Sequence, residues 1–246
     1  LQPDQIHVTS LHPPSLDALA EEGFPVGRDN SAALQGASTV LLAVQPQQIV
    51  ALVDEIRDDI DPARHKVISV VSSVTVAQLR EMIPAPTQVV RAMPNTAVSI
   101  GESMTCLAAD PDSADALDEA EALFKGVGLT IRIEDEMMVG ATALCACGIA
   151  FFLRSVRAAS QGGIEIGFHP EDALLLAAQT ARGAASLVLR DDHHPESEID
   201  RVTTPRGCTI AGLNEMEHQG FSSAMIKGFV LSAQKAALLF DDGDVA

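Results

Sequence analysis

The segment "STVLLAVQPQQIVALVDEI" at residues 38–56 decides the fold class. Its first seven residues are almost all apolar, which is typical of a strand that is buried on both faces of a sheet. Pro46 ends that strand. Beyond it, apolar residues return at helical spacing, at Ile49, Val53 and Ile56. A buried strand followed directly by an amphipathic helix predicts one repeat of an α/β fold with a parallel sheet.

Strand-like and helix-like runs alternate on both sides of this segment. The further strands are expected at residues 5–10, 66–71, 87–93, 103–109 and 129–133, and the further helices at 15–24, 75–83 and 113–127. After Glu134 the strand pattern stops, and residues 137–240 show only helical spacing. We therefore predict two domains. Residues 1–135 form an α/β domain with a mainly parallel, Rossmann-like sheet, and residues 136–246 form an all-helical domain.

Composition excludes several classes of protein. Hydrophobic residues make up 47% of the 246 residues, so the chain is not intrinsically disordered. The net charge of −18 and the absence of Trp and Tyr argue against a nucleic-acid partner, and the charge also argues against an anionic membrane surface. The apolar runs are short and no signal-peptide pattern opens the chain. We expect a cytoplasmic protein with no membrane contact.

The four cysteines do not have the spacing of a metal site. Cys106, Cys145, Cys147 and Cys208 form no C-x-x-C pair, and each lies among apolar or small residues. Zinc ligands usually come in closely spaced pairs. We expect no metal, and four buried, reduced thiols.

One feature of a dinucleotide-binding sheet is missing from the sequence. Such a sheet opens with a strand, a G-x-G-x-x-G turn and a helix whose amino end binds the pyrophosphate. No such turn occurs in residues 1–246, since "GVGLTI" at 126–131 follows a helix and enters a strand. We expect the first strand and its Gly-rich turn to be absent. Whether they are absent from the natural protein or only from this chain stays open.

Three strand ends carry turn and hydroxyl residues. They are "AVQPQ" at 43–47, "SVVSSVT" at 69–75 and "RAMPNT" at 91–96. Ligands of open parallel sheets bind at the carboxyl ends of the strands, so these three ends predict a cleft. Helix capping is the alternative for Ser72, Ser73 and Thr75.

The strand at residues 5–10 bears on the choice of cofactor. It ends without an acidic residue and is followed by Ser10 and His12. An acidic residue there would bind the ribose of NAD and repel a 2′-phosphate. The residues therefore favour NADPH, with NADH left as the alternative.

The loop "TTPRGCTIAG" at 203–212 leads into a helix that Gly220 is expected to end. The first amides of that helix have no partner within it, and with the helix dipole they suit a carboxylate or phosphate. The alternative is a helix capped by Thr203 or Thr204.

Two long segments resemble the signatures of the pyrroline-5-carboxylate reductase family. They are "VVRAMPNTAVSIGESMT" at 89–105 and "TTPRGCTIAGLNEMEHQGF" at 203–221. Shorter segments follow in family order, namely "LLAVQPQ", "SVVSSVT", "DDHHP" and the Gly167–Phe168 corner. The resemblance covers essentially the whole chain. It implies a Rossmann domain, and a helical domain that interlocks with a second subunit. It also implies hydride transfer from NAD(P)H to 1-pyrroline-5-carboxylate, which gives L-proline.

The resemblance also implies the residues of the site. Together with Ser10, the cofactor residues are expected to be Asn30, Ala43, Val44, Gln45, Pro46, Val70, Val71, Ser72, Met93, Pro94 and Asn95. The substrate residues are expected to be Thr204, Gly207, Cys208, Thr209, Asp192 and Asp135. The amides of Cys208 and Thr209 and the Thr204 hydroxyl would hold the substrate carboxylate. The Thr209 hydroxyl would meet the ring nitrogen and act as the catalytic group.

Three positions depart from the family pattern. Gln45 replaces a lysine, "CACGIAF" at 145–151 replaces "SGSGPAY", and Arg206–Gly207 replaces Gly-Gly. Besides the reductase of pyrroline-5-carboxylate, two hypotheses therefore stay open. One is a reductase of another cyclic imino acid, and the other is an inactive cofactor-binding homologue that serves as an oligomeric partner. The retained Thr204, Gly207 and Thr209 favour activity. The resemblance implies a homodimer, with larger rings of dimers as an open alternative.

Overall fold

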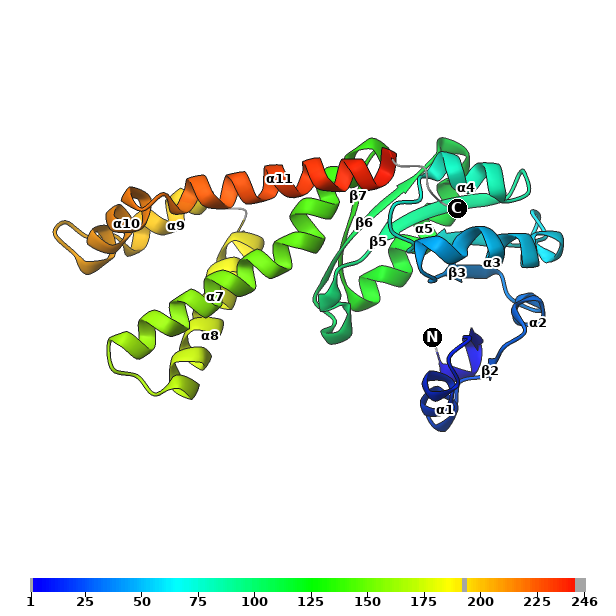
Figure 1. The fold of residues 1–246 in the computed structure, drawn as a ribbon, viewed down its shortest axis with the longest axis horizontal. Coiled ribbons are helices and arrows are strands. Elements are labelled where there is room, and N and C mark those ends of the chain that lie inside the picture. The colour runs from blue at the N-terminus through cyan, green and yellow to red at the C-terminus, as the bar shows by residue number, and fades with distance from the viewer. Residues whose placement is uncertain (1, 192–193, 242–246) are drawn as a thin grey trace. The chain divides into compact units, whose positions relative to one another are not determined.

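The computed structural model describes residues 2–191 and 194–241, which belong to two compact units (Figure 1). Unit 1 contains the chain up to Cys145 together with the end of the chain from Ala236, and unit 2 contains Ala146–Lys235. The units divide ten residues beyond the boundary expected at 135, because the first part of the helical segment packs on the sheet. Met138 and Ala143 are both buried there.

Unit 1 is built on a five-stranded sheet. Its strands are β3 (Thr39–Leu42), β4 (Lys66–Ser69), β5 (Gln88–Met93), β6 (Ser103–Ala109) and β7 (Gly128–Arg132), in the order β3-β4-β5-β6-β7. All neighbours are parallel except β5 and β6, which are antiparallel. The link between those two strands is too short for a crossover helix and holds only the 3₁₀ turn η4 (Thr96–Ile100). The mainly parallel sheet is confirmed.

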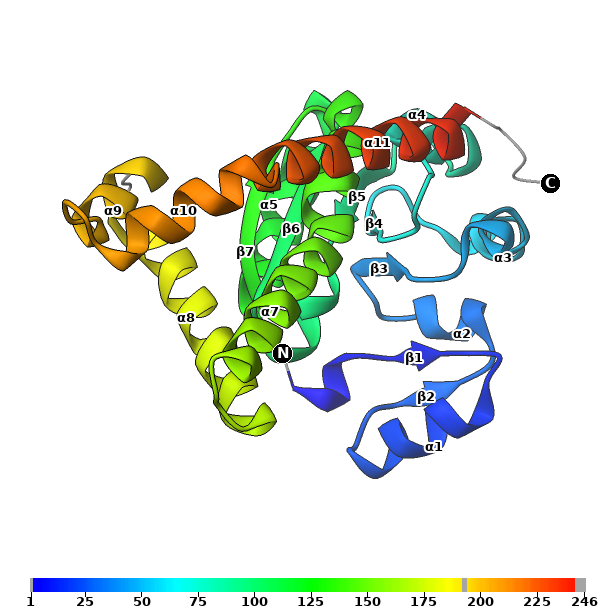
Figure 2. The same cartoon turned by 60° about the vertical axis from the view of Figure 1, so that its left-hand side comes forward.

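The helices of unit 1 follow the predicted alternation. They are α1 (Pro13–Glu21), α2 (Asn30–Leu34), α3 (Ile49–Ile56), α4 (Val76–Met82), α5 (Ala114–Phe124) and α6 (Met138–Ala141). Two short strands, β1 (Val8–Thr9) and β2 (Val26–Gly27), form a separate parallel pair, which Figure 2 shows side by side. The sequence did not predict β2 and α2, because two to five residues carry no periodic signal.

Consecutive residues of the central strands enter two different cores. In β4, Val67 packs in the cluster that contains residues of α3 and α4, whereas Ile68 packs with Phe124 of α5. This alternation follows from the pleat of a strand. The expectation that residues 38–44 are buried on both faces was wrong, since Leu41 is 49% exposed. β3 is the edge strand of the five-stranded sheet, and only Val40 and Leu42 of its apolar residues enter the core.

Gly128 permits the close approach of β6 and β7. A Cβ atom at this position would lie 2.1 Å from the carbonyl oxygen and 2.4 Å from the nitrogen of Ser103. Its φ of 147° is also a conformation that side-chain-bearing residues rarely adopt. Gly126, two residues earlier in the 3₁₀ turn η6 (Lys125–Val127), has no atom within 4 Å of such a Cβ.

Unit 2 is entirely helical. It contains α7 (Gly148–Glu165), α8 (Pro170–Asp191), α9 (Pro195–Val202), α10 (Cys208–His218) and most of α11 (Phe221–Asp241). Helices α7 and α8 touch where a Cβ on Gly163 would lie 3.0 Å from that of Ala173. Helices α7 and α11 meet through the rings of Phe151 and Phe229, which lie 5.0 Å apart in an edge-to-face contact.

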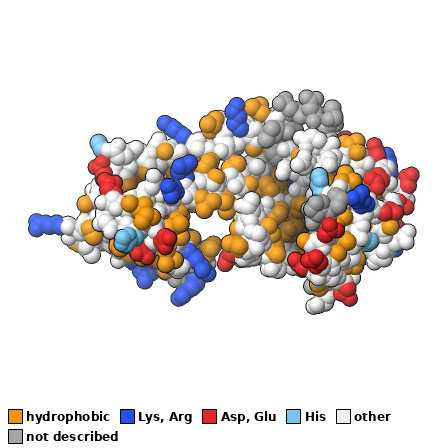
Figure 3. Space-filling view, turned by 60° about the horizontal axis from the view of Figure 1, so that its bottom comes forward, with side chains coloured by type: hydrophobic (Ala, Val, Ile, Leu, Met, Phe, Trp, Pro, Cys, Tyr) orange, Lys and Arg blue, Asp and Glu red, His pale blue; other side chains and the backbone are white. Residues whose placement is uncertain are grey.

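The helical segment Asp135–Glu165 is unusually apolar and exposed. Its most apolar 18-residue window has a mean hydropathy of 1.8, and only 17% of that window is buried. Among the described residues, this is the one helix that is long and apolar enough to cross a membrane, judged by length and composition only. The apolar runs in this part of the sequence look short because Gly140, Thr142 and Gly148 interrupt them. Figure 3 shows hydrophobic side chains on the surface of the helical unit.

We predict that Gly128→Ala lowers the free energy of unfolding by about 2 kcal/mol or more, because the strands must separate or the backbone must leave its conformation. The matched variant Gly126→Ala should stay within about 0.5 kcal/mol of the parent. Chemical denaturation followed by far-ultraviolet circular dichroism measures both. Equal stability of the two variants would contradict the packing role of Gly128.

Candidate active site

Three predicted cofactor segments follow neighbouring strand ends of the sheet in unit 1. The register places Leu42 beside Ser69, and Ser69 beside Arg91. The amide of Val70 donates to the carbonyl of Leu42 at 2.9 Å, which continues the β3–β4 pairing past the last strand residue. The segments 43–46, 70–72 and 93–95 therefore come together at one edge of the sheet. This edge, here called the strand-end ledge, is where ligands of open parallel sheets bind.

The hydroxyls that follow β4 divide into capping and exposed groups. Thr75 caps α4, since its Oγ1 accepts from the amide of Gln78 at 3.1 Å while the Gln78 side chain accepts from the amide of Thr75 at 2.9 Å. This arrangement is a capping box. The capping alternative is thus confirmed for Thr75. Ser72 is exposed at the ledge.

The turn after β5 is held from several sides through Asn95. Its backbone amide donates to Ser103 Oγ at 3.2 Å, and its side-chain oxygen accepts from the amide of Ala97 at 3.1 Å. Its Nδ2 donates to the carbonyl of Cys145 at 3.2 Å. The side chain is therefore committed to shaping the turn, and the turn is fixed before any ligand arrives.

The same turn is joined to an irregular stretch of helix. Residues Thr142–Cys147 form the π-helical turn η8, between α6 and α7. Thr142 Oγ1 donates to Met93 Sδ at 3.0 Å and to the carbonyl of Met138 at 2.8 Å. π-helical turns are rare and occur often at functional sites. This π-helical turn could not be predicted from the sequence, because its composition is that of an ordinary apolar helix.

Ser10 and Asn30 lie with the short strand pair of unit 1. The Ser10 hydroxyl accepts from the amide of His12 at 3.1 Å. The amide group of Asn30 donates to both carboxylate oxygens of Glu55, at 3.1 and 3.2 Å. Because β1 and β2 form their own sheet, neither residue is joined to the strand-end ledge by a strand ladder. Their cofactor roles stay predictions.

Asp135 makes two contacts inside unit 1. One oxygen pairs with Arg91 Nη1 at 2.9 Å, and the other accepts from the amide of Val76 at 3.0 Å. The Arg91 side chain is only 4% exposed. Sequence reasoning missed Arg91, although a charged residue in the middle of an apolar strand signals a buried partner. The structure gives Asp135 a structural role, and its substrate role stays a prediction.

The loop at 203–212 lies in unit 2 and presents an uncapped helix. Helix α10 begins at Cys208 with Gly207 as its N-cap, and no described side chain caps it. Thr203 Oγ1 instead donates to the carbonyl of Ile199 at 2.7 Å, at the end of α9. The alternative of a cap by Thr203 or Thr204 was therefore wrong. The amides of Cys208 and Thr209 keep the free geometry that suits an anion.

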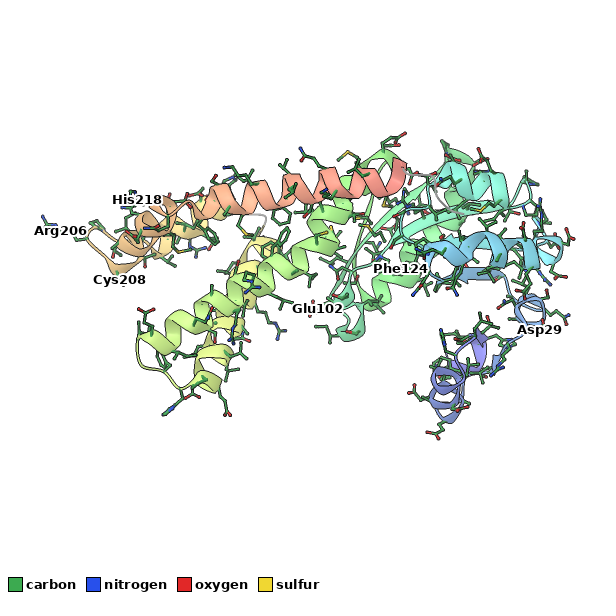
Figure 4. All side chains as sticks on the ribbon, viewed as in Figure 1. Asp29, Glu102, Phe124, Arg206, Cys208 and His218 are labelled. Atoms are coloured by element: carbon green, nitrogen blue, oxygen red, sulfur yellow. The ribbon has the colours of Figure 1, made fainter. Side chains whose placement is uncertain are left out.

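Two loop residues explain the backbone of this site. A Cβ on Gly207 would lie 2.5 Å from Thr204 Oγ1 and 3.0 Å from its carbonyl oxygen, so a side chain there would displace the Thr204 hydroxyl. Arg206 has a φ of 60°, which is left-handed backbone. Figure 4 shows its side chain extending away from the loop and from Cys208.

Comparison with known proteins decides the family. Residues 135–239 match the family described as pyrroline-5-carboxylate reductase dimerisation, and residues 2–73 match the family described as NADP oxidoreductase, coenzyme F420-dependent. Pyrroline-5-carboxylate reductase 2 of Dictyostelium discoideum is 48% identical over 232 residues, with 88% of this chain and 77% of that protein covered. The chain belongs to the pyrroline-5-carboxylate reductase family.

Other members of the family extend this likeness. Pyrroline-5-carboxylate reductase 1 of D. discoideum is 48% identical over 249 residues, which cover 96% of this chain and 45% of that longer protein. The chain thus spans less than half the length of that relative. The solved pyrroline-5-carboxylate reductase of Coxiella burnetii superposes with a TM-score of 0.90 at 28% identity, and covers 96% of this chain and 89% of that one.

The backbone conformation at Arg206 explains which residue the family has at this position. The family pattern has Gly-Gly where this chain has Arg206–Gly207, and left-handed backbone explains a glycine at the first position. The "CACGIAF" departure begins at Cys145, within the π-helical turn, and continues into α7. Asp192 lies outside the described residues, as does His193.

The expectation of four buried thiols was wrong. Cys208 is exposed, because it is the first residue of α10, and Cys145 and Cys147 are only half-buried. His65 lies in a loop and is nevertheless only 1% exposed. It lies directly before β4, and its Nδ1 accepts from the amide of Asp61 at 2.9 Å. A loop that folds back on the sheet buried a histidine that the sequence pattern could not place.

We predict that Asp135→Asn lowers the free energy of unfolding by about 2 kcal/mol, because the buried Arg91 loses its negatively charged partner. The control is Asp54→Asn, which removes the carboxylate of an exposed ion pair. In that pair, Asp54 Oδ1 lies 3.8 Å from Arg57 Nη1, and its loss should change the free energy of unfolding by under about 0.5 kcal/mol. Chemical denaturation of both variants is the measurement. A stable Asp135→Asn protein with a raised KM for substrate would favour the substrate role instead.

Proposed function

We propose that this protein reduces 1-pyrroline-5-carboxylate to L-proline by hydride transfer from NADPH, with NADH as the weaker donor. The observation that carries the proposal is the uncapped amino end of α10. There, two amides without helical partners follow Gly207 and lie on the same loop as the Thr204 hydroxyl. A helix end of this kind binds a carboxylate, which is the one charged group that every cyclic imino acid offers.

The strand-end ledge suits the nicotinamide end of the cofactor. Its side chains are small or flat at Ala43, Val44, Pro46 and Ser72, and Ala43 and Ser72 are exposed. The turn beside them is preformed by the hydrogen bonds of Asn95. These features leave open backbone on which a planar ring can lie. One solved relative, the pyrroline carboxylate reductase of Plasmodium falciparum, has NADP bound; at 21% identity it supports the fold of this chain alone.

Hydride transfer to the imine requires the protein mainly to position the two reactants and to place charge beside them. A bound nicotinamide supplies the hydride, and the chain supplies orientation. We propose that the amides of Cys208 and Thr209 hold the substrate carboxylate. The Thr209 hydroxyl holds the ring nitrogen, which keeps the C=N carbon directed at the donor. No acid–base triad is required, because the imine is protonated before it is reduced.

We further propose that the protein works in the cytoplasm as a homodimer formed through unit 2, and that such dimers can assemble into rings. Large apolar side chains are exposed on three helices of that unit. They include Phe152 and Leu153 on α7, Leu174 and Leu175 on α8, and Val230 and Leu231 on α11. The match of residues 135–239 to a dimerisation family supports a second subunit as their cover. The described cysteines are all free thiols, which suits a reducing compartment.

The deciding experiment is a steady-state assay of the protein with NADPH and 1-pyrroline-5-carboxylate. A six-membered cyclic imino acid in parallel tests the alternative raised by the Arg206 and "CACGIAF" departures. We expect the five-membered ring to give the larger kcat/KM. Tight NADPH binding without turnover of either imine would replace the proposal with that of an inactive homologue.

We predict that Thr209→Ala lowers kcat/KM for the imine by about 10- to 100-fold and leaves the Kd of NADPH within about twofold, because only the substrate nitrogen loses a partner. Thr203→Ala is the control on the same loop, since that hydroxyl donates to the carbonyl of Ile199. Isothermal titration calorimetry measures the Kd of NADPH. If Thr209→Ala weakened NADPH binding by the same factor as it lowered kcat/KM, the assigned role of Thr209 would be wrong.

We predict that Leu231→Asp in α11 produces a monomer, because a buried carboxylate at an apolar interface lacks a partner. Leu129→Asp is the matched control, since Leu129 and Leu231 are both 57% exposed but Leu129 lies on β7 in unit 1. Light scattering coupled to gel filtration measures the mass of each. A dimeric Leu231→Asp protein would move the interface away from this part of α11.

A further inference from the structure

Two cysteines lie in contact at the point where the helical segment joins the sheet. Cys106 belongs to β6 and Cys145 to the π-helical turn η8, and their sulfur atoms are 3.9 Å apart. Cys106 is 2% exposed, whereas Cys145 is only half-buried and so accessible from solvent. The residues are 39 positions apart in the sequence, so their spacing does not predict the contact.

The surroundings of the pair direct reactivity to one sulfur. The side chains packed around it are apolar, and include Val76, Ala108 and Met138. The contact with the Cys106 sulfur lowers the pKa of Cys145 to about 7. The same contact, together with burial, raises the pKa of Cys106. Of the two sulfurs, the half-buried one is therefore the more readily deprotonated, and the thiolate is the reactive form of cysteine.

The pair is also connected to the strand-end ledge. The carbonyl of Cys145 accepts from Asn95 Nδ2 at 3.2 Å. In the β5–β6 ladder, Cys106 lies directly opposite Met93. The two cysteines thus contact the first and the last residue of the turn that we propose to border the nicotinamide. Cys145 is also the last residue of unit 1 before the chain enters unit 2.

We propose that Cys106 and Cys145 form a thiol-oxidation site at which a hydroperoxide produces an intramolecular disulfide that ties η8 to β6 and slows turnover. The Cys145 thiolate attacks one peroxide oxygen, the O–O bond breaks, and a sulfenic acid and hydroxide form. Cys106 then gives its proton to the sulfenic oxygen, its sulfur attacks the sulfenic sulfur, and the S–O bond breaks. That proton and the hydroxyl group leave as water. The two sulfurs lose two electrons and the peroxide gains them.

The disulfide requires a local movement. A sulfur–sulfur bond is about 2.05 Å long, so the two atoms must approach by about 1.9 Å. Strand β6 is held by ladders on both sides, whereas η8 is a single π-helical turn, so η8 is the part that moves. Its displacement carries the carbonyl of Cys145 away from the Asn95 side chain. A misplaced nicotinamide turn lowers turnover even by shifts of about 1 Å.

The chemical test does not depend on any activity. The full chain is treated with hydrogen peroxide, digested without reduction, and mapped by mass spectrometry. We expect one linked peptide that joins Cys106 to Cys145, and that a dithiol reductant separates. Cys145→Ser should abolish it. The matched control Cys147→Ser lies in the same π-helical turn and should retain it. A peptide linked through Cys147 or Cys208, or none at all, would overturn the proposal.

The functional test rests on the proposed reductase activity. In wild type, peroxide should lower kcat with pyrroline-5-carboxylate by about tenfold or more in step with the linked peptide, and the reductant should restore it. The Cys145→Ser variant should keep its own kcat through the same treatment. Complete disulfide formation without loss of kcat would support the oxidation site but overturn its proposed effect on turnover. A lack of activity before treatment would count against the reductase and not against the disulfide.

Discussion

A buried ion pair between Arg91 and Asp135 joins the parts of unit 1 on which the site depends. Arg91 lies in β5, at the row where the register also places Ser69 and Leu42. The second oxygen of Asp135 accepts from the first amide of α4. One carboxylate in the segment that follows β7 therefore contacts both a strand and a helix entry. A charge buried at this depth is tolerated only with its partner in place. The pair therefore specifies where the chain leaves the sheet and begins its helical half.

From that point the strand-end ledge and the helical segment are built together. Asn95 and Met93 of one turn bind Cys145 and Thr142 of the π-helical turn, through an amide and a thioether. The turn is thus held by the segment that leads into the next unit. In a family whose chemistry consists mainly of holding two reactants in position, a preformed turn supplies more than an acid or a base would. It also makes the turn sensitive to whatever changes η8, including the state of the two thiols.

A helix end in unit 2 is the other candidate binding feature of the chain. The Thr203 hydroxyl donates to a carbonyl at the end of α9, and Gly207, the N-cap of α10, has no side chain that could cap the helix. The amides of Cys208 and Thr209 are therefore left for a ligand. The exposed apolar faces of α7, α8 and α11 belong to the same unit. The proposed carboxylate site and the proposed dimer surface therefore belong to one set of helices.

The sequence by itself determined the alternation of strands and helices, the change to helices after Glu134, and the two segments that resemble the signatures of the family. Those signals are local, because they arise from the period of apolar residues and from turn chemistry. It could not determine that β5 and β6 are antiparallel, that Arg91 meets Asp135, or that the alternative cap of α10 is absent. It equally missed the exposed Leu41, the buried His65 and the contact between Cys106 and Cys145. Each of these is a relation between residues distant in the chain, and only tertiary packing brings such residues within contact distance.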